Sequence, residues 1–237
     1  MAGSDKYHGA LLYAVNTVSR LVDLIYVHSS ARNLELINNL KQESASFITI
    51  DQSELDQSAS SVDCILVGPG LGVGERQRCL VSDLLSNYPE RKFVLDADAL
   101  KVIDPDWLGS NCLVTPHAGE FEQLFDLKPT PDNVLAMAGK YGCVVVLKGQ
   151  TDYVSDGSDL YANQTGNAGL TKGGTGDVLA GLIAGLACTN ELLLAAQTGV
   201  FVLGLAGDQL FERVGFNYSA EDVVERLPKT LGVGARG

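Results

Sequence analysis

Basic residues are scarce in this chain. It has 17 lysines and arginines against 29 aspartates and glutamates, a formal net charge of -12 and a pI near 4.6. Such a charge excludes general binding to nucleic acid or to an anionic membrane surface. An anionic ligand would need local donors, such as the N–H groups of a helix N-terminus, because the overall field repels it.

Paired metal ligands and long apolar runs are also missing. The three histidines include no pair at metal-ligand spacing, and the five cysteines form no C-x-x-C pair, so neither a zinc site nor a disulfide framework is expected. This favours the reducing cytosol. No apolar run reaches about 18 residues without a charge or a glycine-rich break, so we expect no membrane span. The polar first ten residues are unlike a signal peptide. The cysteines are Cys64, Cys79, Cys112, Cys143 and Cys188.

Short apolar runs alternate with longer helical patterns, such as residues 8–22 and 32–42. The runs are continuously apolar, which is typical of parallel strands covered on both faces. A chain of 237 residues, 46% of them apolar, can bury these elements in one core. We therefore predict a single α/β domain over residues 1–237, with a parallel sheet between layers of helices. The runs are residues 23–29, 46–50, 64–70, 92–98, 112–117 and 143–149.

The alternation stops after the last of these runs. Residues 152–166 predict a β-hairpin, with Asp156-Gly157 as its turn signal. From Gly173 onward the chain is predicted to be almost wholly helical.

The two last helical patterns cover residues 194–215 and 219–228. Ser219 and Asp222 form a variant of the capping box at the start of the second one. Pro228 is expected to end that helix.

Glycine-rich or polar residues follow four of the predicted strands. In open α/β sheets ligands bind beyond the carboxyl ends of the strands, so residues 68–72, 96–98, 115–120 and 148–151 should converge. The first segment, in GPGLGVG, is not a G-x-G-x-x-G fingerprint, because Val73 stands where the third glycine should be. It is either a tight strand-to-helix turn or a place where a ligand approaches bare backbone.

The polar residues of two other strand ends leave alternatives open. Asp96 and Asp98 could hold a metal or a ribose, or Asp98 could simply cap the following helix. His117 and Glu120 lie three residues apart at a predicted helix start and could share a face. His117 is then either a structural histidine or a ligand contact.

The segment KGGTGD, residues 172–177, carries the clearest chemical signal. Glycines before a helix leave several N–H groups pointing at one spot, with the helix dipole behind them. Asp177 follows in the first turn, where it can accept a proton from a hydroxyl. Phosphoryl transfer needs such an anion site beside a base, although a tightly packed helix start would show the same pattern. Because Lys172 precedes the glycines, this is not a Walker A loop.

The segments GPGLG, DADAL, TPHAGEF, LKG with SDG, and NQTGNAGLTKGGTGDVLAG occur in this order. Together they resemble the ADP- or ATP-dependent NAD(P)H-hydrate dehydratases of the ribokinase-like superfamily, from GSDKYHGA to about SAEDVVERLPKTL. The resemblance implies a ribokinase-like three-layer α/β/α fold with a mostly parallel central sheet and a late β-hairpin. It also implies a cytoplasmic lyase of metabolite repair, which binds nucleotides and forms homo-oligomers.

The implied activity is the repair of hydrated NADH or NADPH (NADHX or NADPHX). Enzymes of this family phosphorylate the 6-hydroxyl of the damaged ring with ADP or ATP and Mg²⁺, and phosphate then leaves to restore the nicotinamide. By the same resemblance Asp177 is the catalytic base, and the backbone of Gly174, Thr175 and Gly176 holds the transferring phosphoryl group.

The matching motifs imply further contacts. Glu120 would organise magnesium through water, and Asn163 and Asn167 would shape the donor-site loop. The hydrated dinucleotide would contact Ala10, Gly70, Gly72, His117 and Asp177. The donor nucleotide would contact Lys148, Gly149, Gln150, Thr151, Asp152 and Gly176.

The chain departs from the family pattern in two places. The family normally has a strand ending in Gly-Gly-Ser before its first helix, whereas this sequence begins MAGS, so a first edge strand is expected to be missing. The segment KGQTDYVSDG is shorter than the common bacterial form. The epimerase domain that is fused to some relatives is not matched, so no epimerase activity is expected.

Two other functions remain open. A small-molecule kinase of the same superfamily, such as one for hydroxyethylthiazole, would also need GTGD, but TPHAGE together with GPGLG favours the dehydratase. A nucleotide-binding regulator without turnover would have no chemical need for the base Asp177.

Overall fold

A computed structural model describes residues 1–3, 7–40 and 46–234. Its α-helices are α1 (His8–Val18), α2 (Ala31–Leu40), α3 (Leu55–Ala59), α4 (Glu75–Asn87), α5 (Asp98–Val102), α6 (Ala118–Phe125), α7 (Pro131–Tyr141), α8 (Thr175–Ala187), α9 (Leu192–Val214) and α10 (Ala220–Gly234). Its strands are β1 (Tyr26–Val27), β2 (Ile48–Thr49), β3 (Cys64–Val67), β4 (Lys92–Leu95), β5 (Cys112–Val114), β6 (Val144–Leu147), β7 (Asp152–Ser155) and β8 (Leu160–Asn163). Two short 3₁₀ turns are η1 (Pro105–Trp107) and η2 (Ala168–Thr171).

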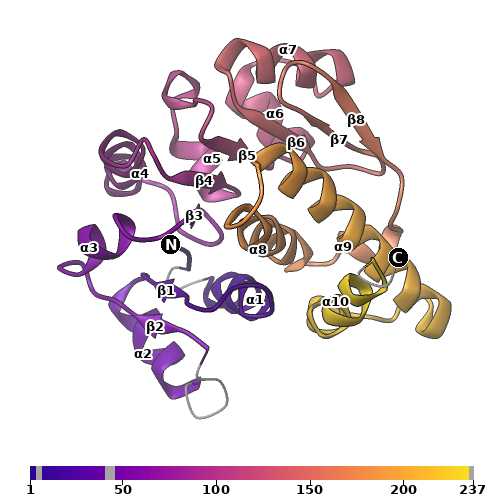
Figure 1. Cartoon of the computed structure of the whole chain (residues 1–237), viewed down its shortest axis with the longest axis horizontal. Coiled ribbons are helices and arrows are strands. Elements are labelled where there is room, and N and C mark those ends of the chain that lie inside the picture. The colour runs from indigo at the N-terminus through magenta and orange to yellow at the C-terminus, as the bar shows by residue number, and fades with distance from the viewer. Residues whose placement is uncertain (4–6, 41–45, 235–237) are drawn as a thin grey trace.

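The fold has three layers around a six-stranded sheet of order β3-β4-β5-β6-β7-β8 (Figure 1). Strands β3 to β6 are parallel, and β7 and β8 follow as an antiparallel hairpin. Gly157 forms the hairpin turn with φ +95°, which a residue with a side chain rarely adopts. The predicted α/β/α arrangement and the late hairpin are therefore confirmed.

The strands are apolar throughout because both faces of the sheet are covered. Val94 and Leu113 point into a core formed with α8, α9 and α10. Phe93 and Leu95 point to the other side, into a core formed with α4, α5, α6 and α7. This alternation explains why the predicted strands showed continuous rather than alternating hydrophobicity.

The first two predicted strands form a separate part of the structure. β1 and β2 pair as a two-stranded parallel sheet, which packs through Val27 with α1 and α2. Residues Met1–Gly3 lie between this sheet and β3: Ala2 N donates to the His28 carbonyl at 3.4 Å, and Met1 N donates to the Leu66 carbonyl at 2.5 Å. The second helical pattern is α2, and residues 41 and 42 of that prediction lie outside the described residues.

The predicted end of the last helix is wrong, because α10 continues through Pro228 to Gly234. A proline inside a helix removes one hydrogen bond and costs about 3 kcal/mol. Packing on both sides of it opposes that cost: Leu227 and Thr230 are buried, and the Thr230 hydroxyl donates to Gln209 Oε1 of α9 at 2.9 Å. The capping box is confirmed, since Ser219 N donates to Asp222 Oδ2 at 2.7 Å and Asp222 N to Ser219 Oγ at 3.4 Å.

Helix α9 is long and apolar enough to cross a membrane by length and composition, although we expected no such segment. More than half of its most apolar stretch, 56%, is buried inside the protein. Core helices of globular proteins have the same property, and Ala196, Val200 and Ala206 of α9 belong to the core beside the sheet.

Candidate functional site

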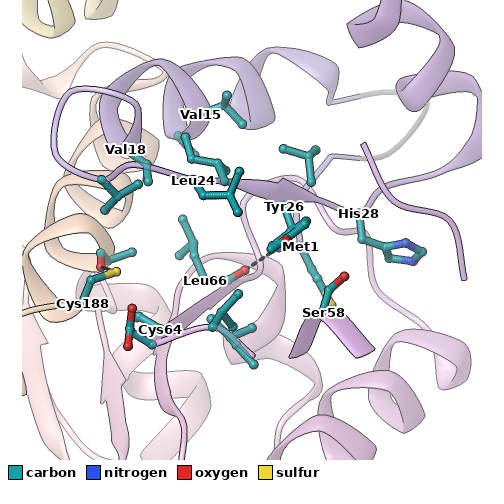
Figure 2. A pocket seen from close by; sticks show the side chains of 18 of the residues that line it. Met1, Val15, Val18, Leu24, Tyr26, His28, Ser58, Cys64, Leu66 and Cys188 are labelled. Carbon is teal, nitrogen blue, oxygen red and sulfur yellow. Dashed lines mark hydrogen bonds between the residues drawn. The ribbon is translucent and has the colours of Figure 1, made fainter. Parts of the chain in front are cut away.

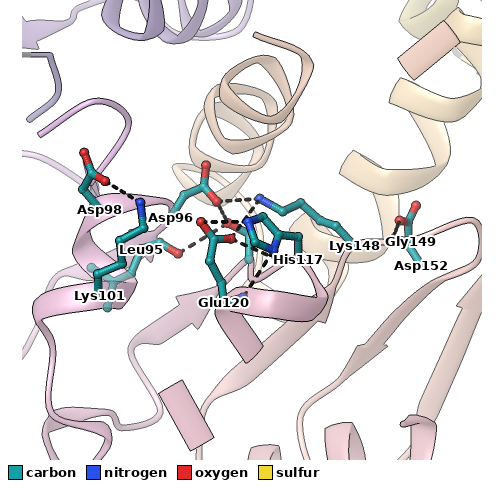
Figure 3. A network of polar contacts seen from close by, with 10 residues as sticks. Leu95, Asp96, Asp98, Lys101, His117, Glu120, Lys148, Gly149 and Asp152 are labelled. Atoms are coloured by element: carbon teal, nitrogen blue, oxygen red, sulfur yellow. Dashed lines mark hydrogen bonds and ion pairs between the residues drawn. The ribbon is translucent and has the colours of Figure 1, made fainter. Parts of the chain in front are cut away.

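The polar residues that follow β4, β5 and β6 meet at one edge of the sheet, as predicted (Figure 3). Asp96 follows β4 and is buried. Its Oδ1 accepts a hydrogen bond from Thr115 Oγ1, after β5, at 2.7 Å, and another from Lys148 Nζ, after β6, at 2.7 Å. The carboxylate thus ties three strand ends together.

Lys148 places a positive charge at the centre of this group. Its Nζ also lies 4.0 Å from Glu120 Oε2. Burial alone would lower the pKa of Lys148, but the carboxylates of Asp96 and Glu120 outweigh burial and raise it above its ordinary value. The ammonium is therefore charged at neutral pH.

His117 has the structural role that the sequence left as an alternative. It caps α6: its Nδ1 accepts from Glu120 N at 3.2 Å, and Glu120 Oε2 accepts from His117 N at 3.0 Å, which completes a capping box. The imidazole is nevertheless 61% exposed, so the same residue is also accessible to a ligand.

The glycine-rich loop ends in the turn that starts α8. Gly174 precedes the helix with φ +95°, and a Cβ there would lie 2.5 Å from the ring of Tyr13. The Thr175 hydroxyl donates to the carbonyls of Leu170 (2.6 Å) and Lys172 (2.8 Å), so it holds the loop in place. The N–H groups in the first turn of a helix have no acceptor carbonyl in the helix itself. The amides of Gly176 and Asp177 lie in that turn and can donate to an anion.

Asp177 is a partly buried carboxylate in that first turn. Burial raises its pKa to about 6; the negative charges of Asp96 and Asp98 act in the same direction, and Lys148 opposes them. A Cβ on the neighbouring Gly176 would lie 3.8 Å from Lys148 Nζ, which places the start of α8 against the group at the strand ends.

The loop of residues 68–72 reaches the same edge of the sheet. Gly68, Gly70 and Gly72 all have positive φ, and a Cβ on Gly70 would lie 3.2 Å from the Cβ of Ala10. The structure thus brings together two residues that were predicted to contact the dinucleotide. Asp98 does not cap α5, whose N-cap is Ala97: Oδ2 accepts from Gly72 N at 2.8 Å, and Oδ1 pairs with Lys101 at 2.7 Å.

The predicted donor-site residues follow Lys148. Gly149, Gln150 and Thr151 form a turn that the Asp152 carboxylate closes, since Oδ1 accepts from Gly149 N at 3.0 Å. Asp152 Oδ2 also accepts from Asn163 Nδ2 at 3.2 Å, and burial raises the pKa of this carboxyl.

Asn167, the other asparagine that was predicted to shape the donor-site loop, holds the segment that precedes α8. Asn167 Oδ1 accepts from Tyr218 Oη at 2.7 Å and from Gly169 N at 3.0 Å, and its Nδ2 donates to Asp208 at 3.0 Å. Both asparagines therefore hold loops in place by hydrogen bonds.

The sequence did not reveal the roles of two residues. Tyr13 lies over Gly174 and donates to Glu221 at 2.6 Å, a bond that raises its pKa to about 12. Its spacing of three residues from Ala10 on one helix was an available signal. Lys172 donates to the carbonyls of Phe216 and Tyr218, which fastens the loop before α8 to the loop before α10. That long-range contact had no signal in the sequence.

The described part of the chain offers a magnesium ion no cage of protein ligands. Among the residues that the structure describes, no three histidine, cysteine, aspartate or glutamate side chains form a direct ligand set. Asp96 and Glu120 instead share the Lys148 ammonium. Mg²⁺ in phosphoryl-transfer sites keeps several waters and is held by one or two carboxylates together with substrate phosphates.

The chain is similar to known proteins over almost its whole length. Residues 1–229 match the sequence profile of a family described as NAD(P)H-hydrate dehydratase. The bifunctional NAD(P)H-hydrate repair enzyme Nnr of Methanocaldococcus jannaschii is 35% identical over 241 residues, 98% of this chain and 47% of that protein. The ADP-dependent (S)-NAD(P)H-hydrate dehydratase of Cenarchaeum symbiosum is 34% identical, over 98% of this chain and 86% of that protein.

The chain thus spans about half the length of the bifunctional relative and most of the other one. Among solved structures, a ribokinase-like superfamily protein from Enterococcus faecalis superimposes with a TM-score of 0.88 at 23% identity, covering 98% of this chain and 85% of that one. The ribokinase-like fold is therefore confirmed.

Proposed function

Because this chain belongs to the NAD(P)H-hydrate dehydratase family, we propose that the residues gathered at the strand ends repair hydrated NADH or NADPH at the expense of a nucleotide. The observation that carries the proposal is the placement of Asp177. Its carboxylate, with a pKa of about 6, lies in the same helical turn as the free amides of Gly176 and Asp177. A base and an anion site thus occupy adjacent positions, as phosphoryl transfer to a hydroxyl requires.

The first step is transfer of the terminal phosphoryl group. Asp177 accepts the proton of the 6-hydroxyl as its oxygen attacks phosphorus, and the bond to the departing AMP or ADP breaks. The amides at the start of α8 and the ammonium of Lys148 stabilise the charge that develops on the phosphoryl oxygens. Asp96 acts as a positioning residue, because it holds that ammonium in place.

The second step restores the ring. The lone pair of the ring nitrogen expels the phosphate from C6, and loss of a proton from C5 re-forms the dihydronicotinamide. Gly70 and Ala10 would contact the hydrated ring region. They lie together because Gly70 has no side chain: a Cβ there would lie 2.7 Å from the Tyr7 carbonyl oxygen and 3.2 Å from the Cβ of Ala10. His117, whose imidazole is exposed, would contact the rest of the dinucleotide.

The donor nucleotide is assigned to the turn of Gly149, Gln150 and Thr151, which Asp152 closes. ADP is the favoured donor, because the relative from Cenarchaeum symbiosum carries that dependence in its name. Magnesium, where bound, would be held through water near Glu120 and would neutralise phosphate charge. The five free cysteines are consistent with a cytoplasmic protein, and a homo-oligomer is part of the proposal.

Recovery of reduced-nicotinamide absorbance tests this function. The chain is incubated with hydrated NADH or NADPH, Mg²⁺ and either ADP or ATP. We expect recovery that requires a donor and is lost in Asp177→Asn, while that variant still binds nucleotide. Release of a stable phosphorylated alcohol without recovery would instead identify a kinase. Undiminished recovery in Asp177→Asn would refute the assignment of the base.

A further inference from the structure

The proposed substrate is an anion, and this chain is acidic. A dinucleotide carries a diphosphate, whereas the chain has a net charge of -12. The carboxylates gathered at the strand ends, those of Asp96, Asp98, Glu120 and Asp177, repel such a ligand. Binding there requires a cation other than Lys148, which we assign to the transferring phosphoryl group.

Lys101 of α5 is a second cation at this edge of the sheet (Figure 3). Its Nζ donates to Asp98 Oδ1 at 2.7 Å, one helical turn earlier. This bond raises the pKa of Lys101, and the charge of Glu120 acts in the same direction. Because Glu120 also raises the pKa of Lys148, the carboxylate lies near both ammonium groups, and Figure 3 shows it between them. Both lysines are therefore charged at neutral pH.

The ammonium of Lys101 has donors left for a ligand. A lysine has three N–H groups, and within the described part of the chain Lys101 donates to Asp98 alone. The side chain of Lys101 is 38% exposed, compared with 19% for Lys148. Two N–H groups of Lys101 are thus accessible to an anion that arrives from solvent.

A single carboxylate joins this ammonium to the glycine loop. Asp98 Oδ1 accepts from Lys101, and Asp98 Oδ2 accepts from Gly72 N at 2.8 Å. The Asp98 side chain is only 13% exposed, so this link is fixed in place. Gly72 lies two residues past Gly70, which adjoins Ala10. The positive charge of Lys101 is therefore held beside the loop that was predicted to contact the dinucleotide.

Neither the large cavity nor Arg78 offers such a charge. The cavity of about 550 Å³ between β1 and β3 (Figure 2) has apolar side chains such as Val15 and Leu66, and its lining includes no lysine or arginine among the residues that the structure describes. Arg78 of α4 already has partners: its Nη1 donates to the Val102 carbonyl at 3.0 Å, and its guanidinium lies 4.7 Å from the centre of the Trp107 ring.

We propose that Lys101 binds the phosphate joined to the nicotinamide ribose of the hydrated dinucleotide, while Lys148 binds the transferring phosphoryl group. This inference rests on the proposed function for the identity of the ligand. The substrate phosphate and the transferred group would then be held by separate ammonium groups on either side of Glu120. Removal of Lys101 would also leave the Asp98 carboxylate without its counter-ion, so that its repulsion of the phosphate adds to the lost attraction.

The test compares two ligands that differ by this one phosphate: reduced nicotinamide mononucleotide and reduced nicotinamide riboside. Their binding is followed by dihydronicotinamide fluorescence, without a donor nucleotide or magnesium. We expect Lys101→Met to weaken mononucleotide binding by about 10- to 100-fold, the range for a hydrogen bond to a charged group, and to leave riboside binding unchanged. Lys101→Arg should keep most of the affinity, because a guanidinium also binds phosphate.

Lys140→Met is the matched control, because it removes the same charge at the opposite edge of the sheet. Lys140 lies at the end of α7, just before β6 begins, whereas Lys148 follows the end of β6. This variant should bind both ligands as the unaltered chain does. Mononucleotide binding that is equal or absent in all four proteins would overturn the proposal. An equal loss of riboside affinity in Lys101→Met would also overturn it, since a changed glycine loop would then be the cause.

The repair assay separates this inference from the proposed reaction. With hydrated NADH as substrate, Lys101→Met should raise KM by a similar factor with little change in kcat, because the contacted phosphate takes no part in the reaction. An unchanged KM in an active enzyme would refute the phosphate site alone. Lys101-dependent binding of the mononucleotide by a chain that restores no hydrate would refute the reaction alone.

Discussion

Lys148 Nζ lies 2.7 Å from Asp96 Oδ1, and this pair of opposite charges adjoins the start of α8, where Asp177 is located. The two charges act on Asp177 in opposite directions: Asp96 raises its pKa and Lys148 lowers it. A carboxylate with a pKa near 6 is largely ionised at neutral pH and is a stronger base than an ordinary aspartate. The pair therefore affects the pKa of the proposed base, and its ammonium adds a positive charge beside the anion site.

The pH dependence of the repair reaction should show this base directly. Asp177 must be ionised to accept a proton, so kcat/KM should rise with pH through about 6 and level off above it. The measurement is the initial rate at low hydrate concentration from pH 5 to 8. A rise of kcat/KM centred near pH 4, the ordinary pKa of an aspartate, would contradict the raised pKa of Asp177.

Substitution of the charge pair should move that limb in opposite directions. Asp96→Asn removes a negative charge beside Asp177 and should shift the limb below pH 6, whereas Lys148→Met removes a positive charge and should shift it above. Lys148→Met should also lower kcat by about 10²–10³-fold, as expected for loss of one donor to the transferring group. Shifts of the same sign in both variants would show that the residues affect Asp177 by structure and not by charge.

The polar strand ends could be predicted from the sequence because two rules sufficed: continuous apolar runs indicate parallel strands, and the carboxyl ends of such strands meet at one edge. Asp96 and Lys148 came together for that reason. Rules that use only neighbouring residues failed where contacts between distant parts of the chain determine the structure. Pro228 does not end α10, because Leu227 and Thr230 are buried on both sides of it. Asp98 binds Gly72, a partner 26 residues away, and is not a cap.

A glycine pair at the start of α8 offers a matched test of the loop. Gly174→Ala must adopt φ +95° and places a Cβ 2.5 Å from the Tyr13 ring, so it should destabilise the fold by about 1–3 kcal/mol. At about 2–4 °C per kcal/mol for a chain of this size, the melting temperature should fall measurably. Gly173→Ala is the control, because nothing lies within 4 Å of a Cβ there. Equal melting temperatures for the two variants would show that neither the positive φ nor the Tyr13 ring restricts the residue at position 174.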